Sequence, residues 1–274
     1  MKKRLLFMDL DGTLLNDEKK ITQGNRVALD RLLERGHGAI ITTGRPLKSA
    51  MDQAHLLGMD QPGCYLIAYN GAVIYDWTTH TQIFSRTLPY GAVFRIFDKA
   101  NAMDLHIQTY DTWKVLVEPR CDNASVRRYC SLIDMEFTVI EDVHTDLREE
   151  PVKCLVIHYE DQTDLLKIQD WIRVTMRDEV DCFFSCDQYL EVVPKGMSKG
   201  ESVKMLSSMM DVPITDAIAV GDAANDLSMI EAAGIGVAMA NGTEEVKRIA
   251  DYITHYDNNH DGIQEVVERF LLTD

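Results

Sequence analysis

Short apolar runs alternate with amphipathic stretches at both ends of this chain, and no other feature of the sequence restricts the fold as much. In the first quarter, apolar runs at residues 4–8, 38–42 and 65–69 are separated by stretches with helical spacing at 25–34 and 47–57. Strands that alternate with helices in this order are typical of a parallel sheet with helices on both of its faces. The first quarter therefore predicts an α/β fold.

The last quarter of the chain repeats the alternation. We expect helices at 203–210, 227–233 and 244–249, with strands at 217–220 and 236–239. Both ends of the chain then contribute to one sheet. The predicted fold class is α/β, with a Rossmann-like parallel sheet as its core.

The middle of the chain has a different pattern, in which short strands are more frequent. Strands are predicted at 106–110, 114–118, 136–140, 152–159 and 189–193, and helices at 92–100, 125–132 and 165–173. A chain of 274 residues is long enough for two domains. We therefore expect an inserted α+β domain at 84–193, and a core domain made of 1–83 and 194–274.

Charge and hydropathy limit the partners and the compartment. The formal net charge of -16 opposes binding to nucleic acid or to anionic membranes. Asp9 ends the first apolar run after four residues, whereas a signal peptide needs roughly 7 to 15, and no run approaches the ~20 of a membrane span. We expect a soluble, cytoplasmic protein with no nucleic-acid or membrane partner, and a homo-oligomer stays open.

The six cysteines are scattered among apolar neighbours, without the paired spacings of a zinc site or a small disulfide framework. We interpret them as reduced thiols of the core. Cys182 and Cys186 lie four positions apart and are compatible with half of a metal site. No second pair accompanies them, so this is the weaker interpretation.

Two aspartates directly follow the first predicted strand. Asp9 and Asp11 are two positions apart, and in an extended chain such side chains point to the same side. They lie beyond the carboxyl end of a parallel strand, where ligands bind in open α/β sheets. Two close carboxylates repel each other unless a cation intervenes, and Mg²⁺ binds carboxylates together with water and phosphate. The alternative is a simple turn with Asp11 and Gly12 as its central pair.

A second acidic group follows the strand predicted at 217–220. Asp222, Asn225 and Asp226 stand where this strand passes into a helix, at the same edge of the predicted sheet. A helix N-cap is the alternative explanation, because Asp and Asn are favoured there. Three acidic or amide side chains within five positions exceed what a cap requires.

Two more segments offer groups that bind phosphate. Thr43, Gly44 and Arg45 end the second strand with a hydroxyl, a glycine backbone and a helix N-terminus. Lys199 stands beside a predicted helix start, and we favour it over Lys195. The alternatives are a plain strand-to-helix turn and a solvated lysine pair in a loop.

These segments together resemble the motifs of the haloacid dehalogenase superfamily. The four motifs occur in the family's order, as residues 9–13, residues 43–45, Lys199 and residues 221–226. The chain is similar in particular to the Cof-like sugar phosphatases, which carry a C2-type cap between the second and third motifs. The turn at 70–72 and residues 234–238 also fit, so the resemblance extends over the whole chain.

The resemblance implies a Mg²⁺-dependent phosphatase that hydrolyses small phosphorylated metabolites, sugar phosphates above all, through a phospho-aspartate intermediate. Asp9 would be the nucleophile, and Asp11 the general acid and base. The metal would be bound by the Asp9 and Asp222 carboxylates and the Asp11 main-chain carbonyl, with Asp226 behind them. The residues implied for the phosphoryl group or the substrate are Leu10, Thr43, Gly44, Arg45, Asn70, Lys199 and Asn225.

The motif spacing indicates where a cap is inserted. From Asp9 to Thr43 is 34 positions, which leaves room for one helix and one strand only. From Thr43 to Lys199 is 156 positions, enough for a cap that closes over the substrate and excludes water. A sugar phosphomutase is one alternative, but its cap would lie in the first interval. A non-catalytic protein that binds a phosphorylated metabolite is the other.

Overall fold

The structure, a computed structural model that describes residues 2–272, divides into two units. Of the described residues, those up to Gly44, those in Ala50–Phe84 and those from Ser198 onward form the first unit. Arg45–Ser49 and Ser85–Met197 form the second. The two ends of the chain therefore build one unit, and most of the middle builds the other.

The first unit contains an eight-stranded sheet with the strand order β14, β13, β12, β1, β2, β3, β4, β5. The strands are β1 (Leu5–Met8), β2 (Gly38–Thr42), β3 (Cys64–Ala68), β4 (Val73–Asp76), β5 (Thr81–Ser85), β12 (Ala217–Gly221), β13 (Ile235–Ala238) and β14 (Tyr252–Ile253). Neighbouring strands from β14 to β3 are parallel, and β4 is antiparallel to β3. The predicted α/β class with a mostly parallel sheet is confirmed, and the β4–β5 edge is an addition that the sequence pattern did not indicate.

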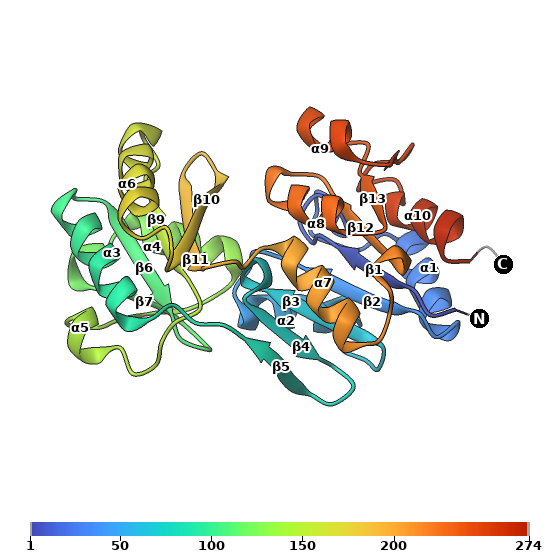
Figure 1. Ribbon diagram of the computed structural model, residues 1–274, viewed down its shortest axis with the longest axis horizontal. Helices are drawn as coiled ribbons and strands as arrows, with labels where there is room; N and C mark the ends of the chain where they lie inside the picture. The colour runs from blue at the N-terminus through green and yellow to red at the C-terminus, as the bar shows by residue number, and fades with distance from the viewer. Residues whose placement is uncertain (1, 273–274) are drawn as a thin grey trace. The chain divides into compact units, whose positions relative to one another are not determined.

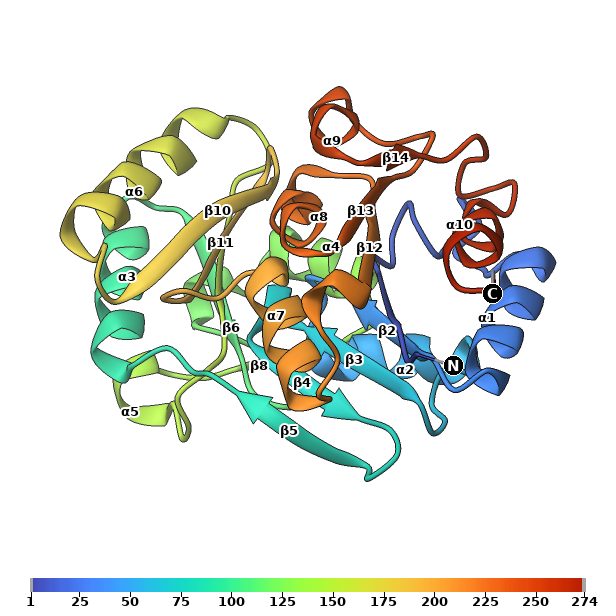
Figure 2. The same ribbon diagram turned by 45° about the vertical axis from the view of Figure 1, so that its right-hand side comes forward.

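The two halves of this sheet are wound in opposite directions from its centre. β1, β2 and β3 follow one another to one side of β1, while β12, β13 and β14 follow one another away from its other side. Since crossovers between parallel strands are right-handed, the helices that connect successive parallel strands in the two halves cover opposite faces, while the last helix lies on the same face as the first (Figures 1 and 2). The helices are α1 (Gln23–Glu34), α2 (Leu47–Leu56), α7 (Lys199–Met209), α8 (Leu227–Ala232), α9 (Glu244–Ile249) and α10 (Gly262–Phe270). α7 contacts α8 on one face, and α1 contacts α10 on the other.

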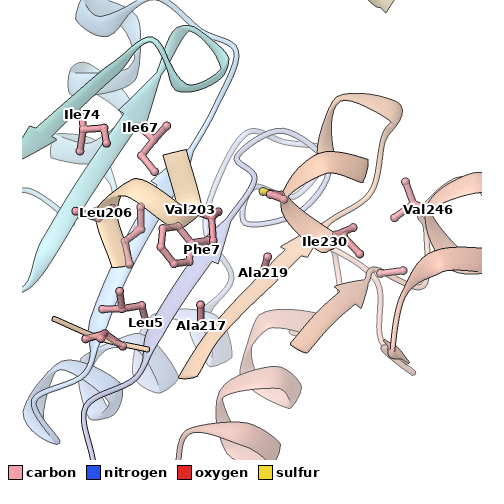
Figure 3. Close-up of a cluster of buried hydrophobic side chains, with 14 residues drawn as sticks. Leu5, Phe7, Ile67, Ile74, Val203, Leu206, Ala217, Ala219, Ile230 and Val246 are labelled. Atoms are coloured by element: carbon pink, nitrogen blue, oxygen red, sulfur yellow. The ribbon is translucent and has the colours of Figure 1, made fainter. Parts of the chain in front are cut away.

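The central strand β1 shows why the sheet is buried on both sides. All four of its residues, Leu5–Met8, are fully buried, and alternate side chains point to opposite faces. Figure 3 shows Leu5 and Phe7 in one buried cluster with Val203 and Leu206 of α7. Burying a leucine or phenylalanine side chain stabilises the fold by about 2 kcal/mol. This packing fixes the strand whose end carries Asp9.

The second unit contains a six-stranded sheet with the order β10, β11, β9, β6, β7, β8. Its elements are α3 (Tyr90–Ala102), β6 (His106–Tyr110), β7 (Val115–Val117), α4 (Ala124–Ile133), β8 (Phe137–Val139), α5 (Val143–Asp146), β9 (Cys154–Ile157), α6 (Gln162–Thr175), β10 (Val180–Cys186) and β11 (Tyr189–Pro194). Neighbouring strands are antiparallel except for the parallel pair of β7 and β8. Antiparallel strands with separate helices make this an α+β unit, and β10 is a strand that the sequence pattern did not indicate.

Side-chain caps fix where two helices of the second unit begin. The Asn123 side chain accepts a 2.8 Å hydrogen bond from the Ser125 amide at the start of α4. The Asp161 side chain accepts one of the same length from the Thr163 amide at the start of α6. Each bond satisfies an amide that has no partner inside its helix, which is typically worth about 1 kcal/mol.

The cysteines only partly follow the expectation of buried thiols. Cys64, Cys121, Cys130 and Cys154 are buried, Cys182 is half-buried and Cys186 is exposed. Neither Cys182 nor Cys186 belongs to the group of potential metal ligands found within residues 2–272. None of the helices in this described range has the length and apolar character that a membrane crossing requires.

Candidate active site

The candidate site lies at the carboxyl edge of the first unit's sheet, where the direction of winding reverses. β1 pairs with β2 on one side and with β12 on the other. Asp9, Thr43 and Asp222 follow the ends of these three strands, and Asn70 follows the end of β3. Ligands of open parallel sheets bind in the crevice outside the strand ends at such a reversal. The topology thus gathers four of the predicted residues at one edge.

Three aspartates converge at this edge. Asp9, Asp222 and Asp226 each offer a carboxylate oxygen, and the three oxygens lie within 4.8 Å of one another. Asp226 is fully buried, Asp9 is 6% exposed and Asp222 is half-buried. The structure therefore brings together three of the four aspartates expected at a metal, although they come from opposite ends of the chain.

A buried lysine joins the cluster. The ammonium of Lys199, the first residue of α7, is hydrogen-bonded to Asp9 Oδ1 and lies 2.6 Å from Asp226 Oδ1. Lys199 is only 1% exposed. Lys195, the other candidate, pairs with Asp181 of the second unit at 2.6 Å. Lys199 therefore lies in the acidic cluster, whereas Lys195 bonds elsewhere.

The cluster carries more negative than positive charge. Burial raises the pKa of Asp9 well above its ordinary value; Lys199 opposes this rise. Burial also raises the pKa of Asp222 to about 6. Burial alone would lower the pKa of Lys199, but the carboxylates of Asp226 and Asp9 outweigh that effect and raise it. The cluster contains one ammonium and three carboxylates, so its charge favours an additional cation.

Asp226 organises the turn that carries Asp222. Its Oδ2 accepts hydrogen bonds from the amides of Asp222 (3.0 Å) and Ala223 (3.1 Å), while its Oδ1 faces Lys199. Both of its oxygens are therefore engaged by the protein. Asn225 lies on the same short turn, immediately before Asp226, and is half-buried.

Asp11 is placed differently from Asp9. β1 ends at Met8, and the chain then turns, with the Leu14 amide donating to the Asp9 carbonyl at 3.2 Å. The alternation rule for extended chain therefore does not reach Asp11, whose carboxylate is 39% exposed and bonds to Lys19 Nζ at 2.8 Å. It is not one of the three clustered carboxylates. Lys19 was not singled out from the sequence, which shows it only as a charged residue in a polar loop.

The two residues after Asp11 shape the surroundings of Asp222. Thr13 Oγ1 donates a 2.8 Å hydrogen bond to Asp222 Oδ1. Gly12 has a φ of 83°, and a Cβ at this position would lie 2.6 Å from Asp222 Oδ2. A larger residue at position 12 would displace that carboxylate. The motif contained both residues, but nothing in the sequence indicated that they meet Asp222.

Thr43, Gly44 and Asn70 form a second polar group at the edge. The Thr43 amide donates to the Ile67 carbonyl (2.8 Å), and the Thr43 carbonyl accepts from the Asn70 amide (3.0 Å). Asn70 is 2% exposed, and among the described residues its side-chain nitrogen and oxygen have no hydrogen-bond partner. A Cβ on Gly44 would approach Asn70 Oδ1 to 2.9 Å. Because an unpaired buried amide costs about 1–3 kcal/mol, Asn70 is suited to bind a polar ligand.

Two predicted residues remain to be placed. Leu10 is fully buried, and its carbonyl accepts a 2.9 Å hydrogen bond from the Leu15 amide. Arg45 is half-buried, and its contacts group it with the second unit. All predicted site residues except Arg45 therefore belong to the first unit.

The donor atoms fit a hard divalent cation. The clustered ligand atoms are carboxylate oxygens, the kind that Mg²⁺ prefers. Neither a cysteine nor a histidine belongs to this group, as far as the described chain extends, so the chemistry does not favour zinc. Such an edge can hold a cation and a phosphate oxygen beside a carboxylate nucleophile.

The chain is similar in sequence and in structure to proteins of a known family. A family model described as haloacid dehalogenase-like hydrolase matches residues 6–267. The 5-amino-6-(5-phospho-D-ribitylamino)uracil phosphatase YitU of Bacillus subtilis is 30% identical over 281 residues, with 98% of each chain covered. A haloacid dehalogenase-like hydrolase from Bacteroides thetaiotaomicron has a TM-score of 0.87 and 34% identity, over 98% of this chain and 99% of that one. TM0651 from Thermotoga maritima has a TM-score of 0.85 and 29% identity, over 99% and 98%.

Proposed function

We propose that this chain, which belongs to the haloacid dehalogenase-like hydrolase family and is a phosphatase, requires Mg²⁺ and hydrolyses small phosphorylated metabolites through a phospho-aspartate on Asp9. One observation carries the proposal. Three buried or half-buried carboxylates converge within 4.8 Å beside a buried lysine, at the carboxyl edge of a parallel sheet. Phosphoryl transfer needs such positioning and charge more than it needs elaborate covalent chemistry.

The metal would be held by oxygen atoms of the two acidic loops. We assign the carboxylates of Asp9 and Asp222 and the main-chain carbonyl of Asp11 as its ligands. Asp226 contributes from behind, because it engages Lys199 and the Asp222 amide. When bound, Mg²⁺ supplies positive charge to the phosphate oxygens and screens the carboxylates from one another.

Asp9 is proposed as the nucleophile. In the first step, a carboxylate oxygen of Asp9 forms a bond to phosphorus, and the bond from phosphorus to the leaving oxygen breaks. In the second, water attacks the acyl phosphate, which releases inorganic phosphate and restores the carboxylate. Lys199 favours the ionised form of Asp9, which burial by itself disfavours.

Asp11 is proposed as the general acid and base. It would donate a proton to the leaving oxygen in the first step and accept one from the attacking water in the second. Its partial exposure and its ion pair with Lys19 leave it outside the carboxylate cluster. A group that must exchange protons with substrate and water is better placed there than among buried charges.

The remaining residues are proposed to bind the phosphoryl group and its substrate. Negative charge develops on the phosphate oxygens, and hydrogen-bond donors that are already oriented stabilise it. The assigned residues are Leu10 and Gly44 through their amides, and Thr43, Arg45, Asn70, Lys199 and Asn225 through their side chains. Asn70 has the clearest support, because its buried amide has no hydrogen-bond partner among the described residues.

The second unit is proposed to act as a cap that sets specificity. It is inserted between Thr43 and Lys199, two residues assigned to the site. We propose sugar phosphates and related phosphorylated metabolites as substrates, and YitU is named for such a polyol phosphate. The net charge of -16 favours small substrates over nucleic acid, and we propose a cytoplasmic site of action.

The test is phosphate release from a panel of phosphorylated metabolites, with Mg²⁺ and with EDTA. We expect hydrolysis with Mg²⁺ only, and Asp9→Asn should lower turnover by on the order of 10⁴-fold or more without unfolding the protein. Asp11→Asn should lower it by roughly 10²- to 10⁴-fold. Appreciable hydrolysis by Asp9→Asn, or in the chelator, would refute the proposal. Isomerised sugar phosphate in place of inorganic phosphate would identify a mutase.

A further inference from the structure

A buried asparagine near the end of the chain holds the loop that carries Asp11. Asn258 lies between β14 and α10 and is 4% exposed. Its Nδ2 donates to the Leu15 carbonyl and to Asp17 Oδ1, both at 3.1 Å. This buried amide bonds to main chain 243 positions away, and it therefore joins the loop after β1 to the segment between β14 and α10.

Asn241 extends this connection to the acidic motif. Its Nδ2 donates to the Gly12 carbonyl at 2.8 Å, and its Oδ1 accepts from the Asn258 amide at 3.1 Å. Only one orientation of the Asn241 amide satisfies both partners. The two asparagines therefore form a chain of hydrogen bonds that runs from Gly12 through Asn241 and Asn258 to Leu15.

Leu15 transmits this connection to Asp11. The Leu15 amide donates to the Leu10 carbonyl at 2.9 Å, and Leu15 pairs with Asp11 in an isolated β-bridge. Leu15 is fully buried, so its carbonyl depends on a protein donor. Fixing that carbonyl fixes the segment that lies alongside Asp11.

The same segment also contacts the second acidic loop. The Thr243 amide, two positions after Asn241, donates to the Asp222 carbonyl at 2.8 Å. The loop after β13 thus bonds to the main chain on both sides of the carboxylate cluster. Its asparagine sets the spacing between the loop of Asp9 and Asp11 and the loop of Asp222.

We propose that Asn258 is a positioning residue for Asp11, with Asn241 as its link to Gly12. The inference rests on the proposed function, since it assigns Asp11 the role of general acid. The side chain of Asp11 is partly exposed and bonds to the exposed ammonium of Lys19, so its direction depends on the main chain that carries it. Asn258 fixes that main chain through its hydrogen bond to the Leu15 carbonyl.

The hydrogen-bond chemistry requires an amide at position 258. An alanine would leave the buried Leu15 carbonyl without its donor. An aspartate has the same shape, but it lacks the donor and would place a second carboxylate beside that of Asp17. Asn258→Asp should therefore be at least as harmful as Asn258→Ala, although it changes a single atom group.

The kinetic test compares two kinds of leaving group. Asn258→Ala and Asn258→Asp are assayed with an alkyl phosphate, whose leaving oxygen needs a proton, and with p-nitrophenyl phosphate, whose leaving group needs little help. We expect kcat/KM for the alkyl phosphate to fall roughly 10- to 100-fold and kcat/KM for the aryl ester to change much less, because kcat/KM reports the first step, in which the leaving group departs. The control is His260→Ala, an exposed neighbour whose ring bonds to Asp257 at 2.6 Å, for which both rates should be retained.

A second measurement does not depend on activity. Amide hydrogen exchange of residues 10–17 in the metal-free protein should be faster in both Asn258 variants than in the wild type or His260→Ala. Equal kinetic losses for both substrates, or unchanged exchange in this segment, would overturn the positioning role. If the wild type shows no phosphatase activity, the proposed function fails, while the exchange measurement still decides whether Asn258 holds the loop.

Discussion

Among residues 2–272, each unit buries one lysine, and the surroundings of the two lysines differ. In the second unit, Lys153 is 1% exposed and its ammonium lies 2.7 Å from Glu191, which also accepts a 2.9 Å hydrogen bond from Ser185. The Lys153 ammonium lies 5.1 Å from the centre of the Tyr110 ring. In the first unit, Lys199 faces two carboxylates, and a third belongs to the same cluster.

The net charge around each buried lysine indicates whether the surroundings favour a further ion. The pair of Lys153 and Glu191 is neutral by itself, and a neutral buried pair that is also hydrogen-bonded needs no further ion. The cluster around Lys199 has an excess of negative charge. Burial raises the pKa values of Asp9 and Asp222, and the neighbouring carboxylates raise them further. The cluster around Lys199, in contrast to the pair of Lys153 and Glu191, therefore favours an additional cation, as the proposed function requires.

The largest expected effect is a loss of phosphatase turnover when Lys199 is replaced. Lys199→Met should lower turnover by on the order of 10³-fold, because it removes a buried cation from the proposed phosphoryl site. The assay is phosphate release at saturating Mg²⁺. Lys195→Met is the matched control, since Lys195 bonds to Asp181 in an exposed pair, and it should retain most of the activity. Equal losses in the two variants would contradict the choice of Lys199.

The next effect concerns stability. Lys153→Met leaves Glu191 buried without its ammonium, and we expect the free energy of unfolding to fall by about 3 kcal/mol. Chemical denaturation followed by circular dichroism measures this. Replacing both partners, Lys153→Met with Glu191→Leu, should recover most of the loss, because no charge is then left unpaired. Lys114→Met, which removes an exposed pair with Glu136, should cost under about 1 kcal/mol.

The third effect is a pH dependence of stability that follows from the raised pKa of Asp222. Its pKa of about 6 in the folded protein lies above the ordinary 3.8, so the folded state holds this proton more tightly than the unfolded state. Metal-free protein should therefore lose up to about 3 kcal/mol as pH rises through this window. Bound Mg²⁺ favours the ionised form, so its stabilisation should be small near pH 5 and full near pH 7. Thermal unfolding with and without Mg²⁺ tests this, and a stabilisation independent of pH would contradict it.

The smallest effect concerns Thr13. The hydrogen bond from Thr13 lowers the pKa of Asp222. Thr13→Val removes this bond, so the pKa of Asp222 should rise further. We expect Mg²⁺ affinity, measured by calorimetry, to weaken by about 5-fold, which corresponds to about 1 kcal/mol. Thr22→Val is the control, because the Thr22 hydroxyl has no hydrogen-bond partner among residues 2–272. Similar losses in both variants would show a general effect of threonine removal.

The sequence predicted those parts of the fold and the site that depend on local patterns. Central strands such as β1 and β2 are continuous apolar runs, and the residues that follow them are short motifs with strong chemical preferences. The edge strand β10 was not predicted, because its sequence, VDCFFSC, mixes half-buried and exposed positions without alternation. The β4–β5 hairpin was also missed, since its turn contains His80 at a φ of 55° where a glycine would have given a signal.

The contacts within the site were less predictable, because most of them join distant segments. Thr13 and Asp222 are 209 positions apart, and nothing near either residue indicates their hydrogen bond. Asn258 was not identified at all, since an asparagine in a polar loop has the same appearance whether it is solvated or buried against another segment. Asp11 shows a different difficulty, because the alternation of side chains stops where the strand stops.

The position of β1 between β2 and β12 has a consequence for how the protein is made. Asp9 leaves the ribosome more than 200 residues before Asp222 and Asp226, which follow the strand that pairs with β1 on its other side. Until then β1 has one exposed edge and the nascent chain has no complete acidic cluster. The proposed divalent-ion site is therefore complete only when residues up to Asp226 have left the exit tunnel.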